Sequence, residues 1–236
     1  MSIILLLLML VGIVALLTIP TYWFDRKQTR PNGDTTLYAS LYDAIYFDNE
    51  KFEREIKLLS APEGSYVLDV GCGTGNRVGN VNNIVGVDLS PDMLSVAKKK
   101  YPTKTFVEGD VLQKELFNKE TFTSIWCLGN TIYLLPKKML FLQNVHRWLD
   151  EKGTLVLQLD EAYCAPSPYR KNFGYDLKRF GNTCRETVKF KKKKTVVETT
   201  FYPTSRDRLL TMAERVGFVL ERKAEHHLYF FRKTTL

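Results

Sequence analysis

The distribution of apolar and polar residues divides this 236-residue chain into one long apolar run at its start and a mixed segment behind it. In the mixed segment, short apolar runs rich in β-branched residues, the pattern of buried strands, alternate with segments whose apolar residues recur at helical spacing. The predicted strands are 66–70, 86–88, 105–108, 122–127, 154–159, 187–190, 195–201, 218–223 and 228–232. The predicted helices are 49–59, one that starts at Ser90, 136–149, and one that ends at Gly217. Together they predict a single α/β unit of roughly 200 residues, a size that can bury a hydrophobic core.

Local signals mark where two of these helices begin. Ser90 can cap a helix whose first position is Pro91, a residue suited to that place. Thr204 and Asp207 have the spacing of a capping box and predict the start of the last helix.

A glycine-rich turn follows the first strand of the mixed segment. Residues 67–75 read Val-Leu-Asp-Val-Gly-Cys-Gly-Thr-Gly, and three glycines in five residues let a backbone turn tightly beside a ligand. Thirteen residues after Gly75, the second strand ends in Asp88, and a carboxylate at such a strand tip can accept both hydroxyls of a ribose. The two features predict a pocket for the adenosine end of a small cofactor.

This region resembles the class I S-adenosylmethionine-dependent methyltransferases of small-molecule type, over roughly residues 38–160. Gly71, Gly73 and Gly75 match the family's Asp-x-Gly-x-Gly-x-Gly pattern, whereas a dinucleotide-binding fingerprint would need its third glycine where Asn76 stands. The resemblance implies a Rossmann-like, doubly wound, mostly parallel seven-stranded sheet with an antiparallel last strand. It also implies S-adenosyl-L-methionine as the cofactor.

The resemblance assigns donor-binding residues to several strand tips and to an N-terminal lid. Asp110 would accept from the adenine amino group and Val111 would cover the ring, while Tyr42 or Tyr46 could hydrogen-bond the donor's carboxylate. Tyrosines at the spacing of Tyr42 and Tyr46 also commonly pack on a sheet. The full expected set is Tyr42, Tyr46, Asp69, Gly71, Cys72, Gly73, Gly75, Asp88, Leu89, Met93, Asp110, Val111, Cys127, Leu128 and Asn130.

The segment between Gly75 and Asp88 is shorter than the family usually carries. Gly79, Asn80, Asn82 and Asn83 in this segment are poor helix formers, so the first crossover helix should be reduced to a turn or two. The expected cost is a more open pocket or a less stable layer beside the sheet.

The chemistry expected of this domain needs few catalytic groups. A sulfonium already activates its methyl group, so the protein mainly has to hold a nucleophile in line at about 3 Å. An amine, phenol or carboxylate acceptor needs little further help, whereas an aliphatic hydroxyl or carbon needs a positioned base. Tyr133, Glu161 and Tyr163 follow the fourth and fifth strands and are candidate bases, with ordinary packing as the alternative for each. The tetrapeptide 127–130, Cys-Leu-Gly-Asn, resembles the corresponding segment of some methyltransferases that act on small amines.

The apolar run at the start, Ile3 to Ile19, contains 17 residues without a charge. As a helix it would extend roughly 26 Å, close to bilayer thickness. The run is followed by Pro20, by an aromatic triplet at 22–24 and by basic residues from Arg26, which favours a single-pass anchor with the rest of the chain in the cytoplasm. The predicted organisation is a membrane anchor at 1–24, a linker at 25–37 and a methyltransferase domain at 38–236. A cleaved secretory signal and a helix lying in the membrane surface are the alternatives.

The net charge of +8 lies entirely in the last third of the chain, because residues 160–236 hold 17 basic and 9 acidic side chains. The basic run Lys189–Lys194 should lie at the tip of a hairpin inserted at about 183–202, either as a solvated tip or against anionic lipid. The sequence argues against nucleic acid as a partner, since it shows no known binding module and no Asn-Pro-Pro-aromatic motif. The four cysteines, at 72, 127, 164 and 184, lack the spacing of a zinc site, so no metal is implied.

These observations predict a membrane-anchored methyltransferase that acts on a small or lipid-soluble acceptor. A catalytically inactive donor-binding scaffold is one alternative. Another user of the same fold, an aminopropyl transferase or a nicotinamide dehydrogenase, is the second.

Overall fold

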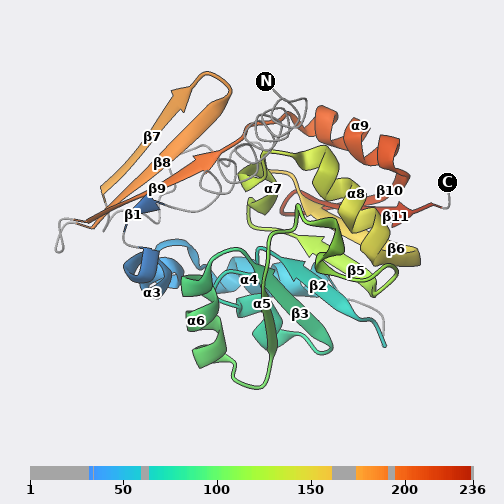
Figure 1. Cartoon of the computed structure of the whole chain (residues 1–236), viewed down its shortest axis with the longest axis horizontal. Coiled ribbons are helices and arrows are strands. Elements are labelled where there is room, and N and C mark those ends of the chain that lie inside the picture. The colour runs from blue at the N-terminus through green and yellow to red at the C-terminus, as the bar shows by residue number, and fades with distance from the viewer. Residues whose placement is uncertain (1–31, 34, 60–63, 161–173, 191–194, 235–236) are drawn as a thin grey trace, which may run out of the picture.

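A seven-stranded sheet forms the centre of the computed structural model, which describes residues 32–33, 35–59, 64–160, 174–190 and 195–234 (Figure 1). Its strand order is β10-β11-β6-β5-β2-β3-β4. The strands are β2 (Val67–Val70), β3 (Ile84–Asp88), β4 (Thr105–Glu108), β5 (Phe122–Cys127), β6 (Leu149–Gln158), β10 (Phe218–Ala224) and β11 (Leu228–Lys233). Strands β2 to β6 pair in parallel, and β11 is antiparallel to both of its neighbours. The predicted seven-stranded, mostly parallel sheet with an antiparallel last strand is confirmed.

Helices cover both faces of this sheet, as a doubly wound fold requires. Strand residues alternate between the faces: Val67 and Trp126 pack in one hydrophobic cluster, and Leu68 and Ile125 pack in another. The first face is covered by α4 (Asn49–Leu58), α5 (Asn76–Asn80) and α6 (Pro91–Lys100). The second is covered by the 3-10 helix η1 (Lys114–Leu116), α7 (Thr131–Leu134), α8 (Lys138–Trp148) and α9 (Arg206–Val216).

The predicted helix boundaries are mostly confirmed. The first crossover helix, α5, has five residues, and the side chain of Ser90 accepts a hydrogen bond from the amide of Met93 at the start of α6. The capping box at Thr204 is wrong: α9 begins one residue later, with Ser205 as its N-cap and no side-chain cap bond. Thr204 therefore precedes the N-cap and cannot reach the amides of the first turn.

A second, four-stranded sheet stands at one end of the molecule (Figure 1). Its order is β1 (Asn32–Gly33), β9 (Thr195–Phe201), β8 (Thr183–Phe190) and β7 (Gly174–Phe180), with every pair antiparallel. The predicted hairpin insertion at about 183–202 corresponds to β8 and β9 but omits β7 and β1. Strand β7 was missed because its sequence, Gly-Tyr-Asp-Leu-Lys-Arg-Phe, is too polar to read as a strand.

Helix α3 (Thr35–Tyr46) lies between the second sheet and α6. Its buried residues Tyr38 and Ile45 form a hydrophobic cluster with Val188 of β8, Val197 of β9 and Met93 of α6. The lid predicted over the glycine turn is thus a helix that packs between the second sheet and α6.

Several predictions fall outside the described residues. These are the anchor at 1–24, most of the linker, Glu161, Tyr163, Cys164 and residues 191–194 of the basic run. Within the ranges that the structure describes, no helix is long and apolar enough to cross a bilayer.

Candidate functional site

The glycine turn lies where the strand order reverses, since β2 has β3 on one side and β5 on the other. All three of its glycines have positive φ angles. A Cβ on Gly71 would lie 2.5 Å from the side chain of Thr131, and one on Gly75 would lie 2.8 Å from the ring of Phe106. A Cβ on Gly73 would meet only the Tyr42 ring, at 4.0 Å. Packing therefore accounts for Gly71 and Gly75, whereas Gly73 marks the side of the turn that is open to a ligand.

The carboxylate of Asp88 is bound to this turn. Its Oδ2 accepts from the Gly73 amide at 2.8 Å, and its Oδ1 accepts from the Ser90 amide at 2.8 Å. Asp110, at the tip of β4, accepts from the Leu112 amide at 2.9 Å. A carboxylate oxygen can accept more than one hydrogen bond, so both groups retain capacity for a ligand. The structure thus joins Asp88 to the turn, while Asp110 orders its own loop.

A buried charged cluster lies on the α4 side of the turn. Asp69 of β2 is 1% exposed, and neither of its carboxylate oxygens has a hydrogen-bond partner among the described residues. The Arg77 Nη2 donates to Glu55 Oε2 at 2.6 Å, and Glu55 is itself buried. Burial raises the pKa of Asp69 to about 7; Arg77 opposes this rise, and the charges of Glu55 and Asp88 add to it. One guanidinium is thus set against three carboxylates.

This cluster extends to the tips of β5 and β6 through Gln158. The Gln158 Nε2 donates to Glu55 Oε1 at 2.8 Å and to the His226 carbonyl at 3.0 Å, while its Oε1 accepts from the Gly129 amide at 2.7 Å. The network fixes the Cys127–Asn130 segment, which was expected to border the donor. The sequence offered no signal for Glu55 or Gln158, because each looks like an ordinary polar position of a helix or strand.

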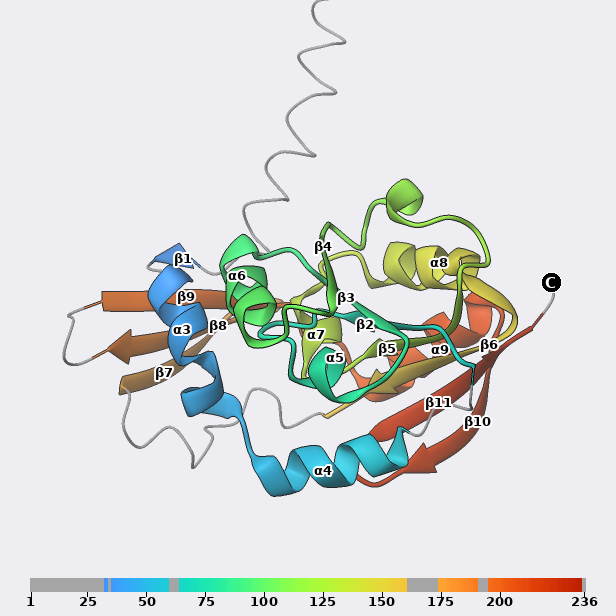
Figure 2. The same ribbon diagram turned by 90° about the horizontal axis from the view of Figure 1, so that it is seen from below.

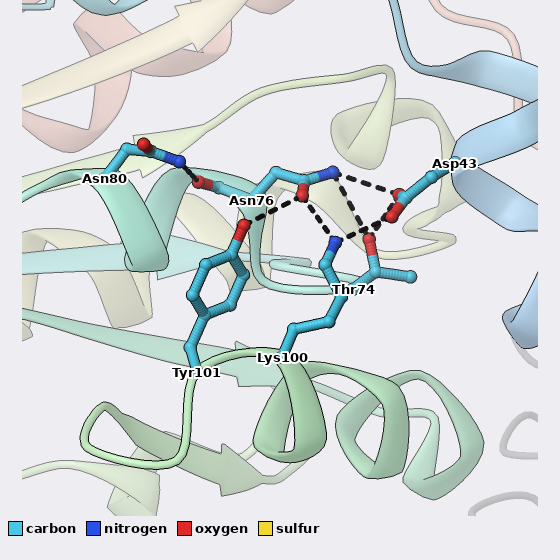
Figure 3. A network of polar contacts seen from close by, with 6 residues as sticks. All are labelled: Asp43, Thr74, Asn76, Asn80, Lys100 and Tyr101. Carbon is cyan, nitrogen blue, oxygen red and sulfur yellow. Dashed lines mark hydrogen bonds and ion pairs between the residues drawn. The ribbon is translucent and has the colours of Figure 1, made fainter.

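A second polar network clasps α3 to the glycine turn (Figure 3). Asp43 Oδ1 accepts from Thr74 Oγ1 at 2.6 Å and from Asn76 Nδ2 at 3.0 Å, and its Oδ2 accepts from Lys100 Nζ at 2.6 Å. Lys100 and the Tyr101 hydroxyl also donate to Asn76 Oδ1. Sequence reasoning did not identify this clasp.

The two lid tyrosines have different surroundings. The Tyr42 ring lies on the Gly73 side of the glycine turn, and burial raises its pKa to about 12, with Arg77 opposing the rise and Glu186 adding to it. Tyr46 instead donates its hydroxyl to Glu186 Oε2, at 3.2 Å, on β8. The structure therefore brings Tyr42 to the predicted donor site and turns Tyr46 toward the second sheet.

The remaining predicted residues are mostly core positions around the turn. Cys72, Met93, Val111, Cys127 and Leu128 are buried, and Leu89 and Asn130 are half-buried. Tyr133 is fully buried in the main hydrophobic cluster, a placement that favours the packing alternative for this candidate base. A surface hollow of about 420 Å³ lies between α6 and Glu108 of β4, and none of the predicted donor residues lines it.

Comparison with known proteins gives a match of residues 67–153 to a methyltransferase domain family. The chain is 31% identical over 128 residues to the 18S rRNA (guanine-N(7))-methyltransferase bud23 of Schizosaccharomyces pombe, an alignment that covers 46% of each chain. It is 30% identical over 105 residues to a dTDP-3-amino-3,6-dideoxy-alpha-D-glucopyranose N,N-dimethyltransferase of Streptomyces fradiae, with 40% of each chain covered. The chain spans about half the length of the curated relatives it matches, or less.

The fold is shared with solved structures. One is CalS10 of Micromonospora echinaspora, an amino pentose methyltransferase solved with S-adenosylmethionine bound. The TM-score is 0.54 at 20% identity, over 84% of this chain and 97% of that one. At this identity the likeness concerns the fold.

Removal of Arg77 alone should destabilise the folded state as long as Asp69 and Glu55 stay buried. We expect Arg77→Met to lower the free energy of unfolding by about 3–5 kcal/mol, because it leaves buried carboxylates without their cation. Urea unfolding would measure this loss. Adding Glu55→Met should restore much of the stability.

Arg54→Met is the control. Arg54 lies on the exposed side of α4, the helix that carries Glu55, and its Nη1 is 3.9 Å from Glu50 Oε2. Its effect should stay below about 1 kcal/mol. Simple addition of the Arg77 and Glu55 effects in the double variant would show that the pair is not coupled.

Proposed function

Because residues 67–153 belong to the methyltransferase domain family and the chain has the class I fold, we propose that this protein is an S-adenosylmethionine-dependent methyltransferase. We place its donor over the glycine turn. Gly73 supports this placement, since its open side is where a backbone can approach a ligand closely. Asp88 would then bind the ribose hydroxyls, Asp110 the adenine amino group, and Leu89 and Val111 the faces of the adenine ring.

The buried, unpartnered carboxylate of Asp69 is the observation that carries the proposal. A buried polar group without a partner costs free energy, and a ligand that supplies a cation removes that cost. The donor carries an ammonium, a sulfonium and a carboxylate, so its net charge is positive. This charge complements a cluster in which Arg77 faces the carboxylates of Asp69, Glu55 and Asp88. When bound, the donor would supply an activated methyl group.

The residues around this site are arranged to position the donor and to enclose it. The Asp43 clasp holds α3 over the turn, which limits the access of water to the donor. Gln158 holds the Gly129 amide and thereby fixes the loop between β5 and α7. No described side chain is assigned as a base, and an acceptor that is already nucleophilic needs none.

A small molecule is the proposed acceptor. The Streptomyces fradiae relative is named for a nucleotide-linked amino sugar, and CalS10 for an amino pentose, which supports this class. The Schizosaccharomyces pombe relative is named for ribosomal RNA, which keeps RNA as the competing acceptor.

We further propose that the run from Ile3 to Ile19 anchors the domain on the cytoplasmic side of a membrane, near a lipid-soluble acceptor. The support is the sequence alone: an uncharged run followed by aromatic and basic residues. Tethering would raise the local concentration of an acceptor that resides in the same membrane.

Calorimetric titration with S-adenosylmethionine should give saturable binding that Asp88→Asn weakens about tenfold or more, because charge-assisted hydrogen bonds to the ribose would be lost. Glu108→Gln is the matched control. Glu108 pairs with Asp88 in register but is exposed, and its substitution should leave the affinity unchanged. Tighter binding of decarboxylated S-adenosylmethionine would favour an aminopropyl transferase, and tighter binding of NAD a dehydrogenase.

The affinity for S-adenosylmethionine should rise with pH between about 6 and 8. Without ligand, the raised pKa of Asp69 keeps this carboxyl largely protonated below about 7, and a bound cation favours its ionised form. Binding should therefore release a proton, which calorimetry in buffers of different ionisation enthalpy would detect. The same raised pKa makes the contribution of Asp69 to the stability of the free protein fall as pH rises from 3.8 toward 7.

Asp69→Asn is the control for this pH dependence. The charges that face Asp69, namely Glu55 of α4, Arg77 of α5 and Asp88 of β3, are unchanged in the variant. The donor's own titration is also common to both proteins. An equal pH dependence in the variant would exclude Asp69 as its source.

Methyl-labelled donor incubated with the full-length protein and separated cell fractions should label small molecules extracted from the membrane fraction. A variant that lacks residues 1–24 should label the same molecules less efficiently when they are presented in vesicles. Transfer of label only to soluble peptides or RNA would contradict both the acceptor class and the role of the anchor.

A further inference from the structure

Glu186 is a buried carboxylate on the inner face of the second sheet. It is 4% exposed, and its neighbours on the same face of β8, Cys184 and Val188, are buried as well. Burying a carboxylate on a sheet face costs free energy unless charge or hydrogen bonds compensate it. The opposite face of β8 carries Arg185 and Lys189, which are exposed. Because successive strand residues point to opposite faces, Glu186 lies on the buried face of β8.

Three tyrosines of α3 adjoin this carboxylate. Tyr38, Tyr42 and Tyr46 recur at intervals of four and therefore share one face of the helix. The Tyr38 ring stands nearly perpendicular to the other two, at 82° to Tyr42 and 76° to Tyr46, with centroid distances of 5.7 and 6.2 Å. Tyr46 donates to Glu186, and Tyr38 donates to the Tyr46 hydroxyl at 3.3 Å.

This row of tyrosines leads from the second sheet to the glycine turn. The Tyr42 and Tyr46 ring centroids are 4.8 Å apart, and a Cβ on Gly73 would lie 4.0 Å from the Tyr42 ring. Tyr42 and Tyr46 are only half-buried, so their rings are within reach of a ligand that enters beside α3. Figure 2 shows α3 in front of the second sheet, with α6 beside it.

We infer that Glu186 and the tyrosines of α3 form the acceptor subsite, and that this subsite binds an acceptor through a basic nitrogen. The inference rests on the proposed methyltransferase function and names the chemical class of its acceptor. Aromatic faces attract a cation through their quadrupole, and a buried carboxylate pairs with it. A carboxylate-bearing acceptor would be repelled by Glu186, and a neutral hydroxyl would gain neither interaction.

The test compares two probes of equal size, benzylamine and benzyl alcohol, which differ in charge. Each is titrated into the full-length protein in the presence of S-adenosylhomocysteine, and binding is followed by ligand-observed NMR. We expect the amine to bind at least about tenfold more tightly than the alcohol, as for a charge-assisted contact. Glu186→Gln should abolish this preference.

Glu198→Gln is the matched control, because Glu198 lies on the neighbouring strand and pairs in register with Thr187, on the opposite face from Glu186. It should leave the preference intact. Equal binding of the two probes by the unaltered protein, or a preference that survives Glu186→Gln, would overturn the inference.

If a thermal unfolding assay shows that Glu186→Gln does not fold, Glu186→Asp is used to test the inference instead. The shorter aspartate side chain moves the carboxylate away from the ligand and should weaken amine binding several-fold. Unchanged amine affinity would contradict the inference. Donor binding is titrated on the same samples. If the unaltered protein does not bind the donor, the proposed function is refuted. If it binds the donor but shows no preference for the amine, only the subsite is refuted.

Discussion

The charge balance around Arg77 is the constraint on which the arrangement of the site depends. Its guanidinium holds Glu55 of α4 at 2.6 Å and opposes the rise in the pKa of Asp69 that burial causes, while Gln158 ties the same glutamate to the loop after β5. A buried charge without a partner is costly, so α4, α5 and the tips of β2 and β6 are held in one arrangement. The positions of the glycine turn and of the β5 loop follow from this arrangement.

The layers around the parallel sheet could be predicted from the sequence because they follow from short-range patterns. Buried parallel strands are continuous apolar runs, and the start of α6 at Ser90 is marked by a cap and a following proline. The second sheet could be predicted only in part. Strands β8 and β9 alternate recognisably, but β7 is polar and β1 has two residues, so both depend on pairing with strands far away in the sequence.

The predicted site shows the same division. The motif located Gly71, Gly73, Gly75 and Asp88, and the structure brings Gly73 and Asp88 into direct contact. It could not separate glycines that packing requires from the one that faces open space, because that depends on Thr131 and Phe106 from other elements. Glu55, Asp43 and Glu186 were missed for a similar reason. A carboxylate in a helix or strand reads as a solvated residue until tertiary packing buries it or gives it a partner.

The short crossover helix shows that a segment of low helix propensity can still be closely packed. Its glycine and asparagines predict a helix of a turn or two, and α5 has five residues. Val78 within it is fully buried, and Gly79 adjoins the ring of Tyr101, where a Cβ would overlap the ring. The hydroxyl of that ring donates to Asn76, which also belongs to the clasp that holds α3. Because α5 ends after five residues, Tyr101 can close over it and Arg77 can reach α4. Gly79 thus leaves room for the Tyr101 ring, and Asn76 connects the turn to Asp43 of α3 and Lys100 of α6.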